Sequence, residues 1–131
     1  MLVDTSGFLC KNNGNEIYHE KAVALYDSAA TLLTSNYVLA EYTALAQVRG
    51  VPRQQIVDFS DRILSDQKLE IVWVDERTHR LATELLKQRP DKSYSLCDAV
   101  SFVLMRERSI AKALTTDRHF EQEGFVRLLK A

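Results

Sequence analysis

The chain has 131 residues, 46% of them hydrophobic and 27% charged, a mixture that predicts one folded domain over residues 1–131 and excludes a disordered chain. Its 17 basic and 18 acidic residues leave a net charge of −1, so no overall charge draws it to nucleic acid. No apolar run approaches the ~20 residues of a membrane span, and the first residues lack a signal-peptide pattern. We therefore expect a cytoplasmic protein in which Cys10 and Cys97 are reduced thiols.

Short strand-like segments alternate with helical segments along the chain. The segments expected as strands are residues 1–3, 31–34, 69–74, 111–116 and 125–129. The segments expected as helices or helical turns are residues 7–13, 16–30, 36–50, 52–66, 75–89, 95–108 and a short stretch after residue 117. This alternation predicts a three-layer α/β/α domain, in which a parallel sheet of about five strands carries helices on both faces. The order of the strands stays open.

Four acidic residues stand out from this pattern. Asp4 and Asp117 each follow a predicted strand, and the carboxyl ends of parallel strands meet at the sheet edge where ligands bind. Glu41 and Asp98 stand inside apolar helical segments, YVLAEY and LCDAV. Acidic side chains are rarely buried unless they are paired or bind a metal, so these two need an explanation.

Each of the four acids also has a purely structural explanation. Asp4 and Asp117 can cap helices, Ser95 and Asp98 fit a capping box, and Glu41 can lie at the wet edge of its helix. A divalent cation accounts for all four together, because hard ions such as Mg²⁺ take carboxylate oxygens. Without a cation, clustered carboxylates repel one another.

The remaining polar candidates are weaker. Asp75 also follows a strand, and we interpret it only as a helix cap. The three histidines share no metal-ligand spacing. We therefore interpret His19, His79 and His119 as surface or local structural residues, with a helper role at the site left open for His119.

Four segments of the chain carry a resemblance to a known family: MLVDTS at 1–6, NYVLAE at 36–41, SLCDAVSF at 95–102 and TTDRHFEQEGF at 115–125. In this order they resemble the PIN-domain family, specifically its single-domain VapC-type toxins, over nearly the whole chain. The family's acidic quartet would fall on Asp4, Glu41, Asp98 and Asp117, and its auxiliary hydroxyls would fall on Ser6 and Thr116. The resemblance implies a PIN-like fold, dependence on Mg²⁺ or Mn²⁺, and endonucleolytic cleavage of RNA. It also implies a homodimer and, for a toxin, inhibition by a small antitoxin protein.

The expected chemistry is hydrolysis of an RNA phosphodiester by water activated at a carboxylate-held ion. We expect Asp4 and Asp98 to hold a first ion, with Glu41 and Asp117 closing the site or holding a second. Ser6 and Thr116 would orient waters.

RNA brings phosphates to this acidic site, so cations are expected at its rim. The candidates for RNA contact are Arg118, beside Asp117, and the run Lys87, Arg89 and Lys92. Two other functions stay open. One is an RNA-processing nuclease of the same fold without an antitoxin, and the other is a non-catalytic acidic α/β binding module.

Overall fold

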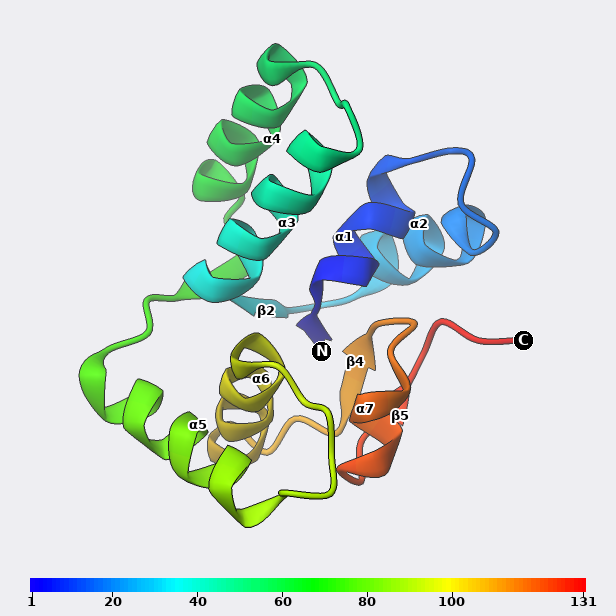
Figure 1. The fold of residues 1–131 in the computed structure, drawn as a ribbon. Helices are drawn as coiled ribbons and strands as arrows, with labels where there is room; N and C mark the ends of the chain where they lie inside the picture. Colours follow the sequence, from blue (N-terminus) through cyan, green and yellow to red (C-terminus); the bar gives the residue numbers. More distant parts are fainter.

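Five short strands form one parallel sheet, which separates two layers of helices (Figure 1). The computed structural model describes all residues from 1 to 131. The strands are β1 (Leu2–Val3), β2 (Leu32–Ser35), β3 (Leu69–Val72), β4 (Lys112–Leu114) and β5 (Val126–Arg127). They lie in the order β3-β2-β1-β4-β5, and every pair is parallel. The predicted three-layer α/β/α architecture is confirmed.

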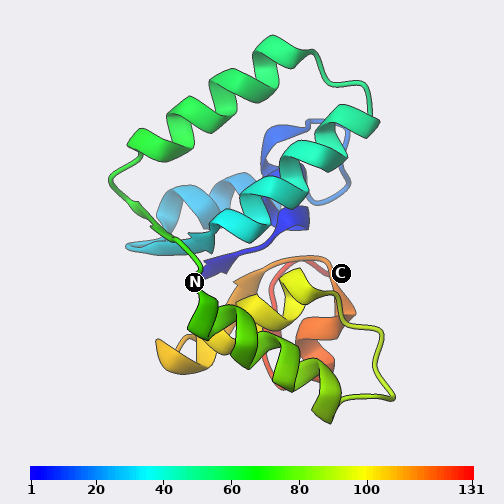
Figure 2. The same cartoon turned by 60° about the vertical axis from the view of Figure 1, so that its left-hand side comes forward.

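Seven helices cover the two faces of this sheet. They are α1 (Thr5–Asn12), α2 (His19–Ser28), α3 (Asn36–Val48), α4 (Arg53–Ser65), α5 (Glu76–Gln88), α6 (Leu96–Glu107) and α7 (Arg118–Gln122). The first four lie on one side of the strands, and α5, α6 and α7 lie on the other, as both views show (Figures 1 and 2). None of these helices is both long enough and apolar enough to span a membrane.

Successive residues of a strand face opposite helical layers, which gives the molecule two cores. Val3 and Leu114 pack into the core on the side of α1 to α4. Their neighbours Leu2 and Ala113 pack into the core on the side of α5, α6 and α7. All four side chains are fully buried, as expected for parallel strands covered on both faces.

The strand order places a topological switch point between β1 and β4. From β1 the chain runs outward through β2 to β3, and it then returns to build β4 and β5 on the other side of β1. Helices that follow β1 and β4 therefore leave toward opposite faces of the sheet. The crevice outside the carboxyl ends of such a strand pair is where open α/β sheets bind ligands. Asp4 and Asp117 lie at this crevice.

The observed elements differ from the predicted ones mainly at their ends. Helix α1 begins at Thr5, before the predicted start at residue 7, whereas α2 begins at His19 because residues 13–18 form turns. Strands β4 and β5 are shorter than predicted. Strand β4 ends at Leu114 because the polar groups of the next three residues form hydrogen bonds with Asp4, with Ser6 and with one another, and no longer only with the neighbouring strands.

Gly7 lets α1 lie directly against the end of β4. A Cβ atom at residue 7 would lie 2.1 Å from the carbonyl oxygen of Leu114. The same oxygen accepts the hydrogen bond from the backbone N–H of Asp4, at 3.2 Å. A side chain at residue 7 would therefore push α1 off the sheet or break the last hydrogen bond between β1 and β4.

We predict that Gly7→Ala lowers the free energy of unfolding by about 3 kcal/mol, the upper range for overpacking a core against backbone. Gly14→Ala is the matched control, because nothing lies within 4 Å of a Cβ at residue 14 and the backbone there has no positive φ. Its stability should stay within about 0.5 kcal/mol of the wild type. Denaturant unfolding of the three proteins measures this, and equal midpoints for both variants would contradict the role given to Gly7.

Candidate active site

All four predicted carboxylates line one pocket at the carboxyl edge of the sheet. The pocket has a volume of about 370 Å³ and is bordered by α1, α3, α6 and the residues after β4. The carboxylates come from four separate segments: Asp4 after β1, Glu41 on α3, Asp98 on α6 and Asp117 after β4. The fold thus brings together residues that are far apart in sequence.

Asp4 is buried and does not use its side chain as a helix cap. Its Oδ2 accepts a hydrogen bond from Thr115 Oγ1 at 3.0 Å, but its Oδ1 is buried without any partner. Burial above all, together with the negative charges of Asp98 and Glu41, raises the pKa of Asp4 to about 7. Thr5 Oγ1, in the same pocket, is also buried without a partner. An unpaired carboxylate oxygen and hydroxyl at one site favour a ligand between them.

Asp98 combines a structural contact with a free oxygen. The predicted capping box is present: Asp98 N–H donates to Ser95 Oγ, and Ser95 N–H donates to Asp98 Oδ2, both at 3.0 Å. His119 Nδ1 lies 2.9 Å from the same Oδ2. The other oxygen, Oδ1, makes no hydrogen bond and remains available in the pocket.

Asp117 has the same division of roles. It caps α7, because its Oδ1 accepts a hydrogen bond from the backbone N–H of His119 at 2.9 Å, and Oδ2 stays unpaired. The imidazole of His119 lies between the two aspartates, with Nδ1 3.4 Å from Asp117 Oδ1 and Nε2 3.2 Å from Ser93 Oγ. A neutral tautomer with the proton on Nδ1 satisfies Asp98 and Ser93 together. His119 therefore orients Asp98, which is the helper position that the sequence left open.

Glu41 differs from the sequence prediction in its burial. Its neighbours in sequence are apolar, yet the Glu41 side chain is exposed and faces the pocket from the edge of α3. The argument from burial was therefore wrong for Glu41, which lies at the wet edge of its helix, and held for Asp98. Cys97 Sγ lies within 4.8 Å of carboxylate oxygens of Asp4 and Glu41. Burial, followed by the charge of Glu41, raises the pKa of Cys97, so the thiol stays neutral.

A chain of hydroxyl groups ties the two strand ends together. Thr115 Oγ1 donates to Asp4, lies 3.1 Å from Ser6 Oγ and accepts the backbone N–H of Asp117 at 3.0 Å. Ser6 Oγ accepts the backbone N–H of Thr116 at 2.9 Å, so Ser6 can donate its own proton to Thr115. Sequence reasoning placed the auxiliary hydroxyls at Ser6 and Thr116. The structure puts Ser6 in the network but uses only the backbone of Thr116, and it adds the fully buried Thr115.

The donor set fits a hard divalent cation. Asp4 Oδ1, Asp98 Oδ1 and Asp117 Oδ2 are free of hydrogen bonds, and they border one pocket together with the Glu41 carboxylate. Two sets of three groups have ligand atoms that all lie within 4.8 Å of one another: Asp4 with Glu41 and Cys97, and Asp98 with Asp117 and His119.

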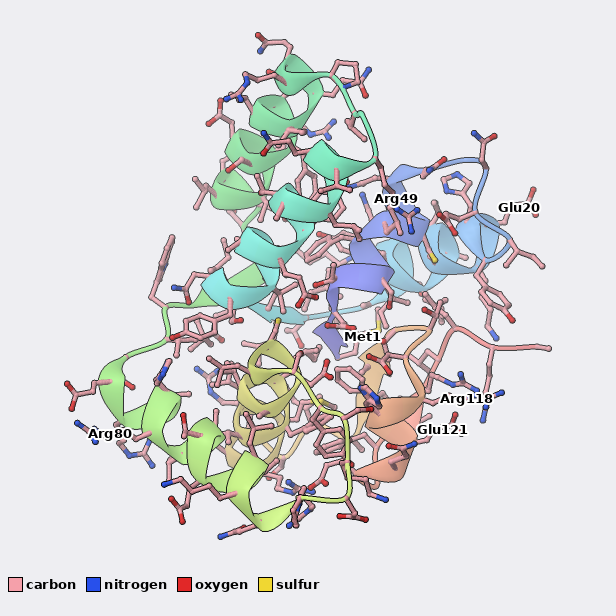
Figure 3. All side chains as sticks on the ribbon, in the orientation of Figure 1. Met1, Glu20, Arg49, Arg80, Arg118 and Glu121 are labelled. Carbon is pink, nitrogen blue, oxygen red and sulfur yellow. The ribbon has the colours of Figure 1, made fainter.

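The four predicted RNA-contact residues lie outside the pocket lining. Lys87 Nζ lies 3.6 Å from the carboxylate of Glu84. Arg89 is held by the buried carboxylate of Glu123, with hydrogen bonds of 3.0 and 3.2 Å. Lys92 Nζ lies 3.5 Å from the carboxylate of Asp91. Arg118 is exposed at the start of α7, on the side of the molecule opposite α3 (Figure 3). Of the four, Arg118 alone makes no ion pair within the protein.

A parallel α/β/α domain with four carboxylates at a switch point belongs to the open α/β domains whose ligand site lies at the carboxyl edge of the sheet, and its donor set fits a hard cation. Comparison with known proteins defines the family within this class. The sequence profile of the PIN domain matches residues 1–125, and the chain belongs to that family.

Two similar proteins are described as 23S rRNA-specific endonuclease VapC20, from two strains of Mycobacterium tuberculosis. Each is 32% identical to this chain over 127 residues, which covers 96% of this chain and 95% of the relative. A crystal structure of Mycobacterium tuberculosis VapC20, described as a sarcin–ricin loop cleaving toxin, superposes with a TM-score of 0.87. It is 29% identical in sequence, and the match covers 95% of both chains.

The burial of Asp4 predicts a pH dependence in metal-free buffer. With a pKa of about 7, folded Asp4 keeps a proton that the unfolded chain releases near pH 4, so stability falls as the pH rises from about 4 to about 7 and is flat above. The side chain of Asp4→Asn cannot titrate. Relative to the wild type, the free energy of unfolding of this variant should therefore rise by on the order of 2 kcal/mol between about pH 5 and pH 8. Urea unfolding of both proteins across this range measures the difference, and a difference independent of pH would show that Asp4 stays ionised.

The hydroxyl network predicts unequal roles for two adjacent threonines. Thr115→Val removes the donor to Asp4 and leaves the N–H of Asp117 unpaired, which should cost about 1–3 kcal/mol of stability and weaken Mn²⁺ binding. Thr116→Val is the matched control, because only its backbone takes part, and its stability should change by less than about 0.5 kcal/mol. Calorimetric titration with Mn²⁺ and thermal melts compare them. Equal losses in both variants would refute the special position of Thr115.

Proposed function

We propose that this protein is a metal-dependent endoribonuclease that hydrolyses phosphodiester bonds in RNA and acts as the toxin of a toxin–antitoxin pair. One observation carries the proposal: four carboxylates with unpaired oxygens converge on one pocket at the switch point of a PIN domain. This is the arrangement that a hydrolase needs to hold a divalent cation beside a phosphate.

In this proposal Asp4, Glu41, Asp98 and Asp117 hold Mg²⁺ or Mn²⁺ through the oxygens that the protein leaves free. When bound, the ion lowers the pKa of a water molecule and offsets the charge of the phosphoryl group. The two sets of ligand atoms that lie within 4.8 Å of one another are compatible with one ion or with two.

The protein's own groups prepare the carboxylates for this task. The donor Thr115 Oγ1 stabilises the charged form of Asp4 against the effect of burial. His119 and the N–H of Ser95 fix one oxygen of Asp98, which leaves the other pointing to the pocket. Because these ligands are fixed before RNA arrives, little reorganisation is needed at the moment of reaction.

The similarity to VapC20 suggests a first substrate to test. That relative is described as specific for 23S rRNA, and its structure as that of a toxin cleaving the sarcin–ricin loop. Because the match runs along nearly the whole chain, we propose a structured ribosomal RNA loop as the substrate class. We also propose a cytoplasmic homodimer that a small antitoxin protein inhibits.

Two other functions remain as alternatives. An RNA-processing nuclease would cleave RNA but have no inhibitor. Co-expression with the protein encoded by the neighbouring reading frame tests this alternative, because an antitoxin would inhibit cleavage. A non-catalytic binding module would bind the ion or a partner without cutting RNA. The metal-dependent cleavage assay separates this second alternative from both nucleases.

The central prediction concerns Asp98→Asn. The amide oxygen of Asn can still accept from Ser95 and His119, so the fold should persist, while the free oxygen and the charge are lost. We expect cleavage of a sarcin–ricin loop RNA to fall at least about 100-fold, because loss of a residue that itself binds the ion should cost at least as much as loss of the groups that orient such residues. EDTA should abolish wild-type cleavage, and Mg²⁺ or Mn²⁺ should restore it. In EDTA the variant should melt at or above the wild-type temperature, because repulsion in the pocket is relieved.

Asp75→Asn is the matched control for that substitution. Asp75 caps α5 through the N–H of Thr78 at 2.9 Å and lies outside the pocket, so cleavage should stay at the wild-type rate. Full activity of the wild type in excess chelator would refute the metal mechanism. An Asp98→Asn protein that cuts RNA and keeps the full stabilisation by Mg²⁺ would return Asp98 to a purely structural role.

A further inference from the structure

The pocket contains a single basic side chain. Five acids line it, the four proposed ligands and Glu16, whereas Arg49 is its one cation. RNA must place several phosphates near these acids, and bound metal ions offset charge only at the phosphate that is cut. A second phosphate of the same strand therefore needs a cation within the pocket, and the candidates named from the sequence lie outside it.

Arg49 lines the acidic pocket from the C-terminal end of α3. It directly follows α3, and about half of its side chain is exposed (Figure 3). Arg49 and Leu9 also line a second depression of about 310 Å³ between α1, α3 and α4. Arg49 thus lies at the junction of the acidic pocket with a neighbouring, less polar one.

The partner of Arg49 in the free protein is Glu16. Arg49 Nη1 lies 3.1 Å from Glu16 Oε1, and Glu16 belongs to the turn between α1 and α2. One guanidinium nitrogen makes this contact, and both side chains are partly exposed, so the pair contributes little stability and opens readily. A phosphate can offer the guanidinium two parallel hydrogen bonds, which the contact with Glu16 does not.

We infer that Arg49 binds an RNA phosphate adjacent to the one that is cut, and that Glu16 holds the guanidinium in place until RNA arrives. The inference rests on the proposed ribonuclease function and adds a substrate-binding residue to the same pocket. It contrasts with a structural role, in which the ion pair only fastens the turn before α2 to the end of α3. The two roles predict different changes in the Kd for RNA. If Arg49 binds a phosphate, Arg49→Gln and Glu16→Gln shift Kd in opposite directions, whereas a structural role predicts shifts in the same direction.

The test measures binding of a fluorescent sarcin–ricin loop hairpin RNA by anisotropy in Ca²⁺, with the RNA checked for intactness on a denaturing gel. Arg49→Gln should raise Kd about tenfold and reduce the dependence of log Kd on log salt by about one phosphate contact. Glu16→Gln should lower Kd about threefold, because it frees Arg49. If the pair is only structural, both variants break the same contact and shift Kd in the same direction, which would overturn the inference.

The double variant separates release of Arg49 from simple loss of a repulsive charge. If Glu16 acts through Arg49, Glu16→Gln has no effect in the Arg49→Gln background, and the double variant binds as Arg49→Gln does. If Glu16→Gln tightens binding equally in both backgrounds, Glu16 only repels RNA and its proposed hold on Arg49 is overturned.

Arg77→Gln is the matched control for removal of a positive charge. Arg77 forms an ion pair of the same 3.1 Å length with Glu107, away from the pocket, and its loss should leave Kd unchanged. An equal rise in Kd for Arg77→Gln would mean that Arg49 acts only through net charge, which overturns the inference. Thermal melts of all variants confirm that they are folded.

The binding assay is independent of cleavage. A wild type that binds the hairpin with the expected Arg49 pattern but cuts no RNA in Mg²⁺ or Mn²⁺ would refute the proposed function and support the role of Arg49. A wild type that cuts RNA, with Arg49→Gln unchanged in Kd and salt dependence, would refute the role of Arg49 alone.

Discussion

The close contact between Gly7 and the carbonyl of Leu114 is the constraint on which the candidate site depends. The helix after β1 can lie against the end of β4 only because residue 7 has no side chain. This contact, together with the hydrogen bond from Asp4 N–H to the same carbonyl, fixes the strand end that carries Asp4 beside the one that leads to Asp117. A side chain at residue 7 would push the end of β1 away from β4 and would thereby strain the hydrogen bond between Thr115 and Asp4.

The same arrangement lowers the stability of the folded protein when no ligand is bound at the site. Asp4 is buried with one unpaired oxygen, and four other acids line its pocket. Desolvation and mutual repulsion both oppose the charged state. Two apolar cores, one on each face of the sheet, provide the stability that offsets this cost. A bound divalent cation would reverse the balance, because the four carboxylates would then attract a common partner. The two apolar cores thus stabilise the folded state, and the clustered carboxylates provide the affinity for a cation.

Sequence patterns predicted the layers, the parallel sheet and four of the pocket's five acids, because each rests on local signals such as strand periodicity and acids after strands. They missed what depends on packing between distant segments. The sequence gives no reason to prefer Thr115 over its neighbour Thr116. Only the structure shows that the side chain of Thr115 donates a hydrogen bond to Asp4, whereas Thr116 uses its backbone N–H. Arg49 follows an ordinary helix. Nothing in the sequence around it indicates that a residue in a turn more than 30 residues earlier contacts it at the pocket. The strand order likewise depends on long-range pairing.

The structural and functional explanations of the aspartates turn out to be compatible, because a carboxylate has two oxygens. At Asp98 and Asp117 one oxygen is used by a helix start and the other is left free over the pocket. The cap fixes the rotamer, and the fixed rotamer presents the free oxygen to a ligand without further loss of conformational freedom. Asp4 reaches the same result through Thr115 in place of a cap. A capping motif in the sequence is therefore no evidence against a ligand role; at a strand-to-helix junction it is a means of orienting the ligand.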